Sequence, residues 1–266
     1  MHDRFNRNIH YLRISVTDRC NLRCVYCMPA EGVEPLSHSD VLSFEEITDF
    51  VRTAVKSGID KVRITGGEPL VRKGIEKLVF QLSQIKEIKD LSMTTNGILL
   101  ENYAETLKKA GLYRINISID ATDPEEYRKI TRNGDVNMVF KGINAALKAG
   151  FTKIKINTVI EKSCDEKNCV DVAQYCRKMG FEHRLIRKMD LEKGLFWQVH
   201  GGEGGKCSEC SRLRLTSNGL VLPCLFSDIS FSVRELGAEN AILKAVECKP
   251  QKGVISKDHH FYNVGG

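Results

Sequence analysis

Short apolar runs alternate with longer amphipathic stretches along the first 190 residues. The runs are rich in Ile, Val and Thr, which is typical of β-strands, and they occupy residues 9–16, 61–65, 90–95, 113–119, 153–160 and 181–189. The stretches between them have helical spacing. Residues 43–58, for example, start with a Ser-x-x-Glu capping box and end at Gly58, and residues 103–111, 139–150 and 168–180 also end at glycine.

Six strand–helix units in series predict the α/β class and a parallel sheet with right-handed crossovers, curled into an open partial (βα)6 barrel of the TIM type. The alternation stops after residue 190. A Gly-rich linker (201–205), a hairpin (211–226) and a terminal helix (232–246) are expected there. We therefore predict a partial barrel over 1–190 and a small C-terminal extension over 191–266.

Composition narrows the class of protein. A chain of 266 residues with 42% hydrophobic residues can bury a sizeable core. It shows no signal-peptide pattern and no run near the roughly 20 apolar residues that span a bilayer, so we expect a cytoplasmic protein without a membrane partner. In that reducing compartment, ten cysteines favour metal ligation over disulfides. The net charge of +6 is dispersed, and we expect a small polyanionic substrate and no nucleic-acid partner.

Three cysteines, Cys20, Cys24 and Cys27, follow the first predicted strand in a CxxxCxxC pattern. Thiolates select iron–sulfur clusters or zinc, and a four-iron cluster held by three cysteines keeps one iron open to a small molecule. A zinc site completed by a distant ligand, or buried cysteines without a metal, are the alternatives from spacing alone.

Other unusual residues also follow predicted strands. A Gly-Gly-Glu-Pro turn follows the second strand, Thr94 and Thr95 end the third, Ser118 and Asp120 end the fourth, and Met189 ends the sixth. Barrels of this kind carry their chemistry at the C-terminal ends of the strands, so these residues should meet on one face.

A second group of three cysteines, Cys207, Cys210 and Cys224, is predicted where a hairpin returns the third to a CxxC pair. It is again one ligand short of four, and a zinc knuckle completed by His200 or Cys248 is the alternative. The remaining cysteines, Cys164, Cys169, Cys176 and Cys248, are interpreted as structural.

Basic residues lie in several predicted strands. Arg212 and Arg214 alternate on one strand, so both side chains should point to the same face, where two guanidinium forks suit a phosphate. Arg13, Lys61, Arg63 and Lys155 lie in other strands. Together they predict a basic barrel mouth.

The first cysteine motif, with Tyr26 before its third cysteine and Gly66-Gly67-Glu68-Pro69 one strand later, resembles the radical S-adenosylmethionine (radical SAM) enzymes. In that family the open iron binds S-adenosylmethionine, which is cleaved to a 5′-deoxyadenosyl radical. The resemblance implies that Cys20, Cys24 and Cys27 hold a [4Fe-4S] cluster. It also implies the cofactor-binding residues Tyr26, Gly66, Gly67, Glu68, Pro69, Thr95, Ser118 and Met189.

The motifs from LRISVTDRCNLRCVYCMP to CSRLRLTSNGLVLPCLFS also resemble, in order, the GTP 3′,8-cyclase family of molybdenum cofactor biosynthesis. This implies a second [4Fe-4S] cluster on Cys207, Cys210 and Cys224 that binds the guanine of GTP. The implied substrate-binding residues are Arg13, Lys61, Arg63, Thr94, Lys155, Arg184, Arg212 and Arg214. The terminal Gly265 and Gly266 would enter the active site as catalytic residues. A flavodoxin or ferredoxin reductant, a downstream pyranopterin-forming enzyme and a homodimer are further expectations.

The chain departs from the family in two places. The stretch between Met189 and Cys207 is several dozen residues shorter, and Arg187 and Lys188 stand where the family usually has an acidic residue and an aromatic one. A radical SAM enzyme acting on a peptide or another nucleotide is the first alternative function. A non-catalytic protein that binds metal or nucleic acid is the second.

Overall fold

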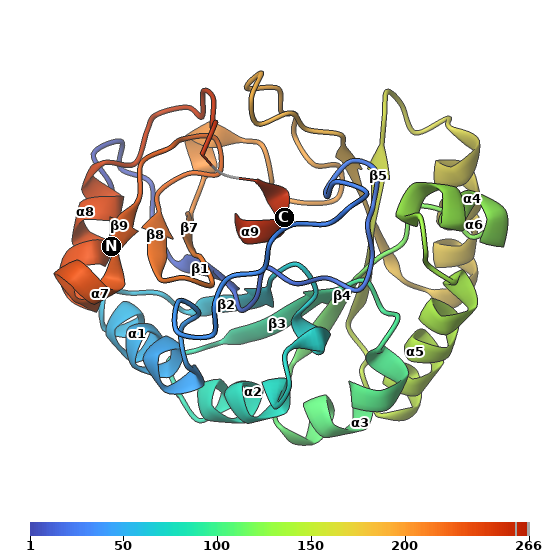
Figure 1. Cartoon of the computed structure of the whole chain (residues 1–266), viewed down its shortest axis with the longest axis horizontal. Helices are drawn as coiled ribbons and strands as arrows, with labels where there is room; N and C mark the ends of the chain where they lie inside the picture. Colours follow the sequence, from blue (N-terminus) through green and yellow to red (C-terminus); the bar gives the residue numbers. More distant parts are fainter. Residues whose placement is uncertain (259, 265–266) are drawn as a thin grey trace.

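The computed structural model describes residues 1–258 and 260–264, and within these ranges nine strands form one sheet that curves into an open arc (Figure 1). Six of the strands are parallel neighbours in chain order, as the sequence predicted. They are β1 (Tyr11–Ser15), β2 (Lys61–Thr65), β3 (Asp90–Thr95), β4 (Arg114–Ser118), β5 (Ile154–Ile160) and β6 (Glu182–Arg187).

Helices cover the outer, convex face of the arc (Figure 1). They are α1 (Phe44–Lys56), α2 (Ile75–Ser83), α3 (Leu100–Lys109), α4 (Pro124–Thr131), α5 (Val136–Lys148) and α6 (Lys167–Met179). Two short 3-10 turns, η1 (Pro69–Val71) and η2 (Cys207–Glu209), lie in the connecting segments. The capping box predicted at Ser43 is present. The Ser43 hydroxyl accepts from the Glu46 amide at 3.1 Å, and the Glu46 carboxylate accepts from the Ser43 amide at 2.7 Å.

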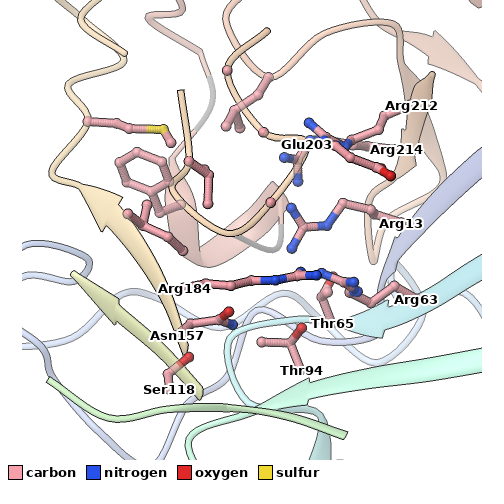
Figure 2. A pocket seen from close by; sticks show the side chains of 18 of the residues that line it. Arg13, Arg63, Thr65, Thr94, Ser118, Asn157, Arg184, Glu203, Arg212 and Arg214 are labelled. Carbon is pink, nitrogen blue, oxygen red and sulfur yellow. The ribbon is translucent and has the colours of Figure 1, made fainter. Parts of the chain in front are cut away.

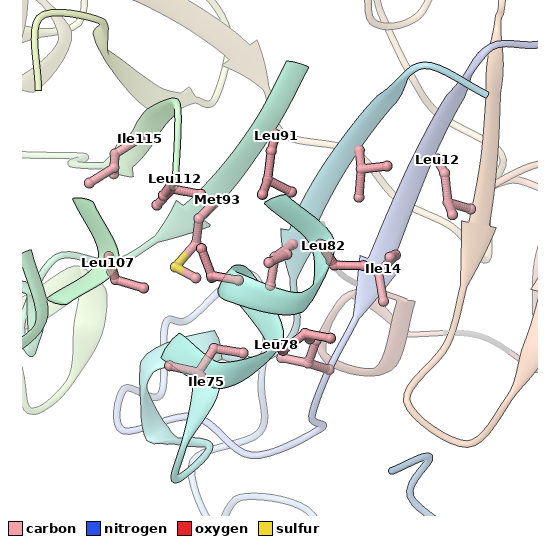
Figure 3. Close-up of a cluster of buried hydrophobic side chains, with 14 of the residues drawn as sticks. Leu12, Ile14, Ile75, Leu78, Leu82, Leu91, Met93, Leu107, Leu112 and Ile115 are labelled. Carbon is pink, nitrogen blue, oxygen red and sulfur yellow. The ribbon is translucent and has the colours of Figure 1, made fainter. Parts of the chain in front are cut away.

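The hydrophobic core lies between the sheet and these helices. Figure 3 shows Leu12 and Ile14 of β1 and Leu91 and Met93 of β3 in one cluster with side chains of α2, among them Leu78. Each of these residues is at most 4% exposed. Side chains alternate across a strand, so the residues between them point to the inner, concave face, where the strands carry polar and charged groups.

The C-terminal region continues the same sheet. Strand β7 (Arg212–Leu215) pairs in parallel with β1, and β8 (Leu220–Leu222) pairs antiparallel with β7, which confirms the predicted hairpin. A short β9 (Phe231–Ser232) completes the edge. Because β7 belongs to the barrel sheet, the two regions share one framework, and the division after residue 190 stays a prediction.

The predicted single helix over 232–246 is wrong. It is two helices, α7 (Val233–Leu236) and α8 (Ala238–Glu247), because Gly237 between them has φ 75°, outside the helical range. The last element, α9 (Phe261–Val264), lies inside the arc (Figure 1). The Arg214 guanidinium holds it by donating to the Val264 carbonyl at 3.2 Å. No helix in the described ranges is long and apolar enough to cross a membrane.

Candidate active site

One cavity of about 680 Å³ lies within the arc, and nearly all the site residues predicted from the sequence line it. Among the described residues, the exception is Pro69, which is buried at the start of η1 directly after the cavity residue Glu68. Gly265 and Gly266, predicted as catalytic, lie outside the described residues. The cavity therefore brings together groups from both cysteine motifs and from strands distant in sequence.

The first cysteine group lies on the loop after β1. The Cys20 sulfur accepts from the Leu22 amide at 3.4 Å, and the Cys24 carbonyl accepts from the Cys27 amide at 2.9 Å, which curls the loop. Burial, the charge of Asp120 and the neighbouring thiols raise the pKa of Cys24, and burial with Cys20 raises that of Cys27 to about 12. Grouped, buried thiols of this kind become stable thiolates when a metal centre compensates their charge.

The donor set fits a cluster better than a single ion. Among residues 1–258 and 260–264, no three or more His, Cys, Asp or Glu side chains are grouped so that they could hold one metal ion. A cluster needs its three thiolates on three separate irons, so the sulfurs need not converge on one point. His200 and Cys248, proposed above as ligands completing a zinc knuckle, do not line the cavity. The zinc alternatives thus gain no support.

The glycine turn after β2 holds the cysteine loop against the sheet. The Gly67 amide donates to the Thr17 carbonyl at 2.8 Å, and the Glu68 amide donates to the Arg19 carbonyl at 2.8 Å. A side chain at Gly67 would place its Cβ 2.4 Å from the Arg19 carbonyl oxygen, closer than atoms can pack. Only glycine permits this approach, which places the loop that carries Cys20 beside the end of β2.

Glu68 is a buried acid, 1% exposed, at the C-terminal ends of β2 and β3. Its carboxylate accepts from the Thr95 hydroxyl at 2.7 Å, the Asn96 amide at 2.6 Å and the Leu70 amide at 3.0 Å. Burial raises its pKa to about 7 even though these bonds act to lower it. Such a fixed carboxylate on a cavity wall suits a ligand with a cationic or amino group.

Tyr26, which also lines the cavity, is held by a buried acid. Its hydroxyl donates to the Asp120 carboxylate at 2.5 Å, and the other oxygen of Asp120 accepts from the Val159 amide at 2.7 Å. The side chains of Ser118 and Met189, predicted as cofactor-binding residues, also line the cavity. The ends of β1, β2, β4 and β5 therefore enclose one end of the cavity, next to the first cysteines.

The basic residues form rows across the inner face. In the strand register Arg13 is paired with Arg63 on one side and with Arg214 on the other. One level lower, Tyr11 lies between Lys61 and Arg212, whose charged groups are 4.9 and 5.7 Å from the centre of its ring. Figure 2 shows the guanidinium groups gathered in the pocket.

These basic residues line the cavity from within the strands and not from the last strand positions. Lys61 is at the first position of β2, Arg13 at the third of five positions of β1 and Arg214 at the third of four positions of β7. The register has an electrostatic consequence. Burial and the neighbouring cations lower the pKa of Arg13 to about 9 and those of Arg63 and Arg214 to about 10. A bound polyanion would relieve this repulsion.

Two more cations complete this part of the wall. The Glu182 carboxylate holds Lys155 at 2.5 Å and Arg184 at 2.9 Å. Close by, the Thr94 hydroxyl is buried and has no hydrogen-bond partner among the described residues. An unpartnered buried hydroxyl on a cavity wall is typical of a position that a ligand satisfies.

The second cysteine group lies at the opposite end of the parallel strands, where they begin. Cys210 precedes the start of β7, whereas Cys20 follows the end of β1, and these two strands are parallel. Since β8 runs back, Cys224 returns to the edge where β7 begins. The two groups are therefore separated by about one strand length, roughly 15 Å.

The cysteines interpreted as structural lie away from the cavity. Cys169 and Cys176 are buried in α6, and neither they nor Cys164 line the cavity.

Sequence reasoning missed several cavity residues. Tyr11, Asn157 and Arg114 face inward because of strand alternation, and Asn96 follows the predicted Thr94-Thr95 pair. Glu203 comes from the Gly-rich linker, and its carboxylate lies 3.7 Å from the Lys61 ammonium. The alternation along each predicted strand was the signal that could have found the first three.

The radical SAM superfamily model matches residues 14–183, which carry the first cysteine group and strands β2–β5. A protein named GTP 3′,8-cyclase from Alkaliphilus oremlandii is 40% identical to this chain over 98% of the chain and 96% of its own length. One of the same name from Petrotoga mobilis is 38% identical, over 98% of the chain and 95% of its own length. The chain belongs to the radical SAM superfamily and, within it, to the GTP 3′,8-cyclase family. The family's cofactors are S-adenosylmethionine and iron–sulfur clusters.

Solved structures bear out the fold. SuiB of Streptococcus suis, in a structure with S-adenosylmethionine, matches with a TM-score of 0.70 at 16% identity, over 94% of this chain and 66% of that one. A protein named anSMEcpe, also with that molecule bound, matches with a TM-score of 0.67 at 15% identity, over 92% of this chain and 80% of that one. The open partial barrel predicted from the sequence is confirmed.

Proposed function

We propose that this chain is a radical SAM GTP 3′,8-cyclase, a lyase that converts GTP to 3′,8-cyclo-7,8-dihydro-GTP in molybdenum cofactor biosynthesis. Family membership supports this proposal, and one structural observation carries it. A single cavity joins Cys20, Cys24 and Cys27, near the C-terminal ends of the strands, to Cys207, Cys210 and Cys224, near their N-terminal ends. The rows of cations lie on the inner face of the sheet between the two cysteine groups.

The residues divide the cavity into two binding regions. Cys20, Cys24 and Cys27 would hold the first cluster, and the fixed Glu68 carboxylate, with the backbone of Gly66 and Gly67, would bind the amino group and polar atoms of S-adenosylmethionine. Bound and reduced, these cofactors supply the radical that removes hydrogen from the ribose. The residues that line this end of the cavity would orient the cofactor toward the interior of the barrel and limit the access of water.

The cationic rows would bind the triphosphate. Arg63, Arg13 and Arg214 stand side by side on neighbouring strands about 5 Å apart, so one extended triphosphate could contact more than one guanidinium group. The remaining predicted substrate residues, Lys61, Thr94, Lys155, Arg184 and Arg212, line the same cavity. The second cysteine group would then hold the cluster that receives the guanine. Fixing both ends of the nucleotide presents its ribose to the radical source.

The shortened segment after Met189 still contributes to this cavity. The match to the Alkaliphilus oremlandii protein extends over 308 aligned positions, more than the 266 residues of this chain, so that relative carries insertions. In this chain Phe196, Val199 and the residues from Gly202 to Lys206 line the cavity instead. The short linker thus supplies part of the cavity wall, which supports the proposal that the substrate site is retained.

Other parts of the proposal rest mainly on the family. A flavodoxin or ferredoxin would supply electrons, and a downstream enzyme would convert the product to a pyranopterin. Gly265 and Gly266 would enter the active site, which the placement of α9 inside the arc supports. A cytoplasmic location and a homodimer stay predictions.

The test is anaerobic turnover of the reconstituted protein with S-adenosylmethionine and a strong reductant. With GTP, mass spectrometry should detect 5′-deoxyadenosine together with a cyclised isomer of GTP, and ATP should give no cyclised product. The Cys20→Ala variant, which lacks a ligand of the first cluster, should form neither. Deoxyadenosine without any nucleotide product would favour the alternative of a radical SAM enzyme with a different substrate.

A further inference from the structure

A buried lysine lies behind the second cysteine group. Lys249 is 1% exposed, follows the end of α8, and does not line the cavity. Its ammonium donates to the Arg212 carbonyl at 2.6 Å and to the Pro223 carbonyl at 2.5 Å. A buried ammonium persists only where its charge and its donors are compensated, so this environment calls for an explanation.

Both bonds act on the backbone beside a cysteine. Pro223 directly precedes Cys224, and Arg212 begins β7 two residues after Cys210. The ammonium has three donors and the two carbonyls occupy two of them. Lys249 thus contacts both strands of the hairpin that brings these cysteines together.

The residues after Lys249 reach the rest of the group. Arg7, which is 6% exposed, donates to the Pro250 carbonyl at 2.7 Å, the Gln251 carbonyl at 3.0 Å and the Cys207 carbonyl at 2.8 Å. A Cβ at Gly253 would lie 3.3 Å from the Cys224 sulfur. The segment 249–253 therefore connects to all three cysteines, through Lys249, Arg7 and the backbone of Gly253.

We propose that Lys249 is a positioning residue for the second cysteine group, one that fixes the backbone beside Cys210 and Cys224 and compensates the negative charge of an iron–sulfur cluster held there. The inference rests on the proposed function for the presence of that cluster. The negative charge of three thiolates exceeds the positive charge of the iron–sulfide core of the cluster, and each added electron increases this excess of negative charge. A nearby ammonium stabilises the reduced state more than the oxidised one, so it raises the reduction potential.

The experiment isolates the second cluster. The parent protein carries Cys20→Ala, Cys24→Ala and Cys27→Ala, so that after reconstitution it should retain roughly four iron atoms per chain, all at the second site. Iron content and the midpoint potential, from a redox titration followed by electron paramagnetic resonance, are the two measurements. Neither depends on turnover.

Three substitutions at one position separate the two roles of Lys249. Lys249→Met removes charge and donors, and should lower both the iron content and the midpoint potential. Lys249→Gln keeps an amide donor, and should shift the potential downward with a smaller loss of iron; it also carries the test if the Met variant fails to fold. Lys249→Arg keeps the charge, and should stay closer to the parent in potential. The matched control is Lys252→Met, because Lys252 is exposed three residues away.

The outcomes are distinct. Equal midpoint potentials in the parent, Lys249→Met and Lys249→Gln proteins would refute the role of Lys249 and leave the proposed function intact. A parent protein that binds no iron would instead refute the second cluster and with it the proposed function. A shift of equal size in Lys252→Met would show that the effect is not specific to the buried ammonium.

Discussion

Arg63→Met should make the ligand-free protein more stable. Arg63 is 7% exposed, and burial and the nearby charges of Arg13 and Arg114 lower its pKa from 12.5 to about 10. A difference of that size amounts to about 3 kcal/mol against the folded, charged state. The variant also loses a cation–π contact with Tyr11 at 5.4 Å and a hydrogen bond to Ser92 at 3.3 Å, together about 1–2 kcal/mol. We expect a net gain of about 1–2 kcal/mol at pH 7.

The same substitution should weaken nucleotide binding. If Arg63 contacts the triphosphate, its loss removes a charge-assisted interaction of about 1.5–3 kcal/mol. That corresponds to GTP binding about ten to a hundred times weaker. The two effects have opposite signs because the buried positive charge that destabilises the ligand-free site is what attracts the anion. Stability and function would be in conflict at this one residue.

Urea unfolding and isothermal titration with GTP measure the two effects on the ligand-free protein. At pH 7, below both the unfolded and the folded pKa of Arg63, the free-energy cost of the charge, from burial and from the neighbouring cations, is present in full. It is relieved only as the pH rises through about 10. The matched control is Arg114→Met, since Arg114 lines the same cavity but is paired with Asp90 through bonds of 2.8 and 2.6 Å. That variant should lose about 1–3 kcal/mol. The reasoning is wrong if Arg63→Met is destabilised to the same degree, or if it binds GTP as tightly as the wild type.

Three further predictions concern the rest of the cavity. Cys20→Ala should lose about half of the bound iron, by colorimetric assay, and keep the second cluster. Gly67→Ala should lower the free energy of unfolding by about 3 kcal/mol, because its Cβ would lie 2.4 Å from a backbone oxygen; Gly180→Ala, with φ 71° and nothing within 4 Å, should cost only about 1–2 kcal/mol in the same denaturation assay. Glu203→Gln should bind GTP a few-fold more tightly in calorimetry, because its carboxylate neutralises Lys61; unchanged affinity at low salt would contradict this.

The fold was largely predictable because the strands carry a local signal. The runs at 61–65 and 90–95 coincide with β2 and β3, since both alternate apolar and polar residues between clear turn signals. The terminal helix failed because residues 232–246 keep a helical pattern on both sides of Gly237. Only the backbone conformation of that glycine, at φ 75°, separates the two helices.

The site was predictable where chemistry is encoded in short motifs. The two cysteine groups and the glycine turn were found because their spacing alone restricts what they can do. Tyr11 and Asn157 were missed because these residue types are common in strands, and their role depends on which way the strand faces. The same holds for Lys249, which the sequence shows as one of many lysines and the structure shows as buried.

Strand register converts ordinary basic residues into a site. Arg63, Arg13 and Arg214 are separated by 50 residues or more along the chain, and each is unremarkable in its own strand. Parallel pairing with no offset places them at one level, on adjacent strands about 5 Å apart. A shift of β7 by one residue relative to β1 would turn Arg214 to the helix side and Leu215 into the cavity. The hydrophobic pattern facing the helices therefore fixes the register, and the register assembles the cationic row for an anionic substrate.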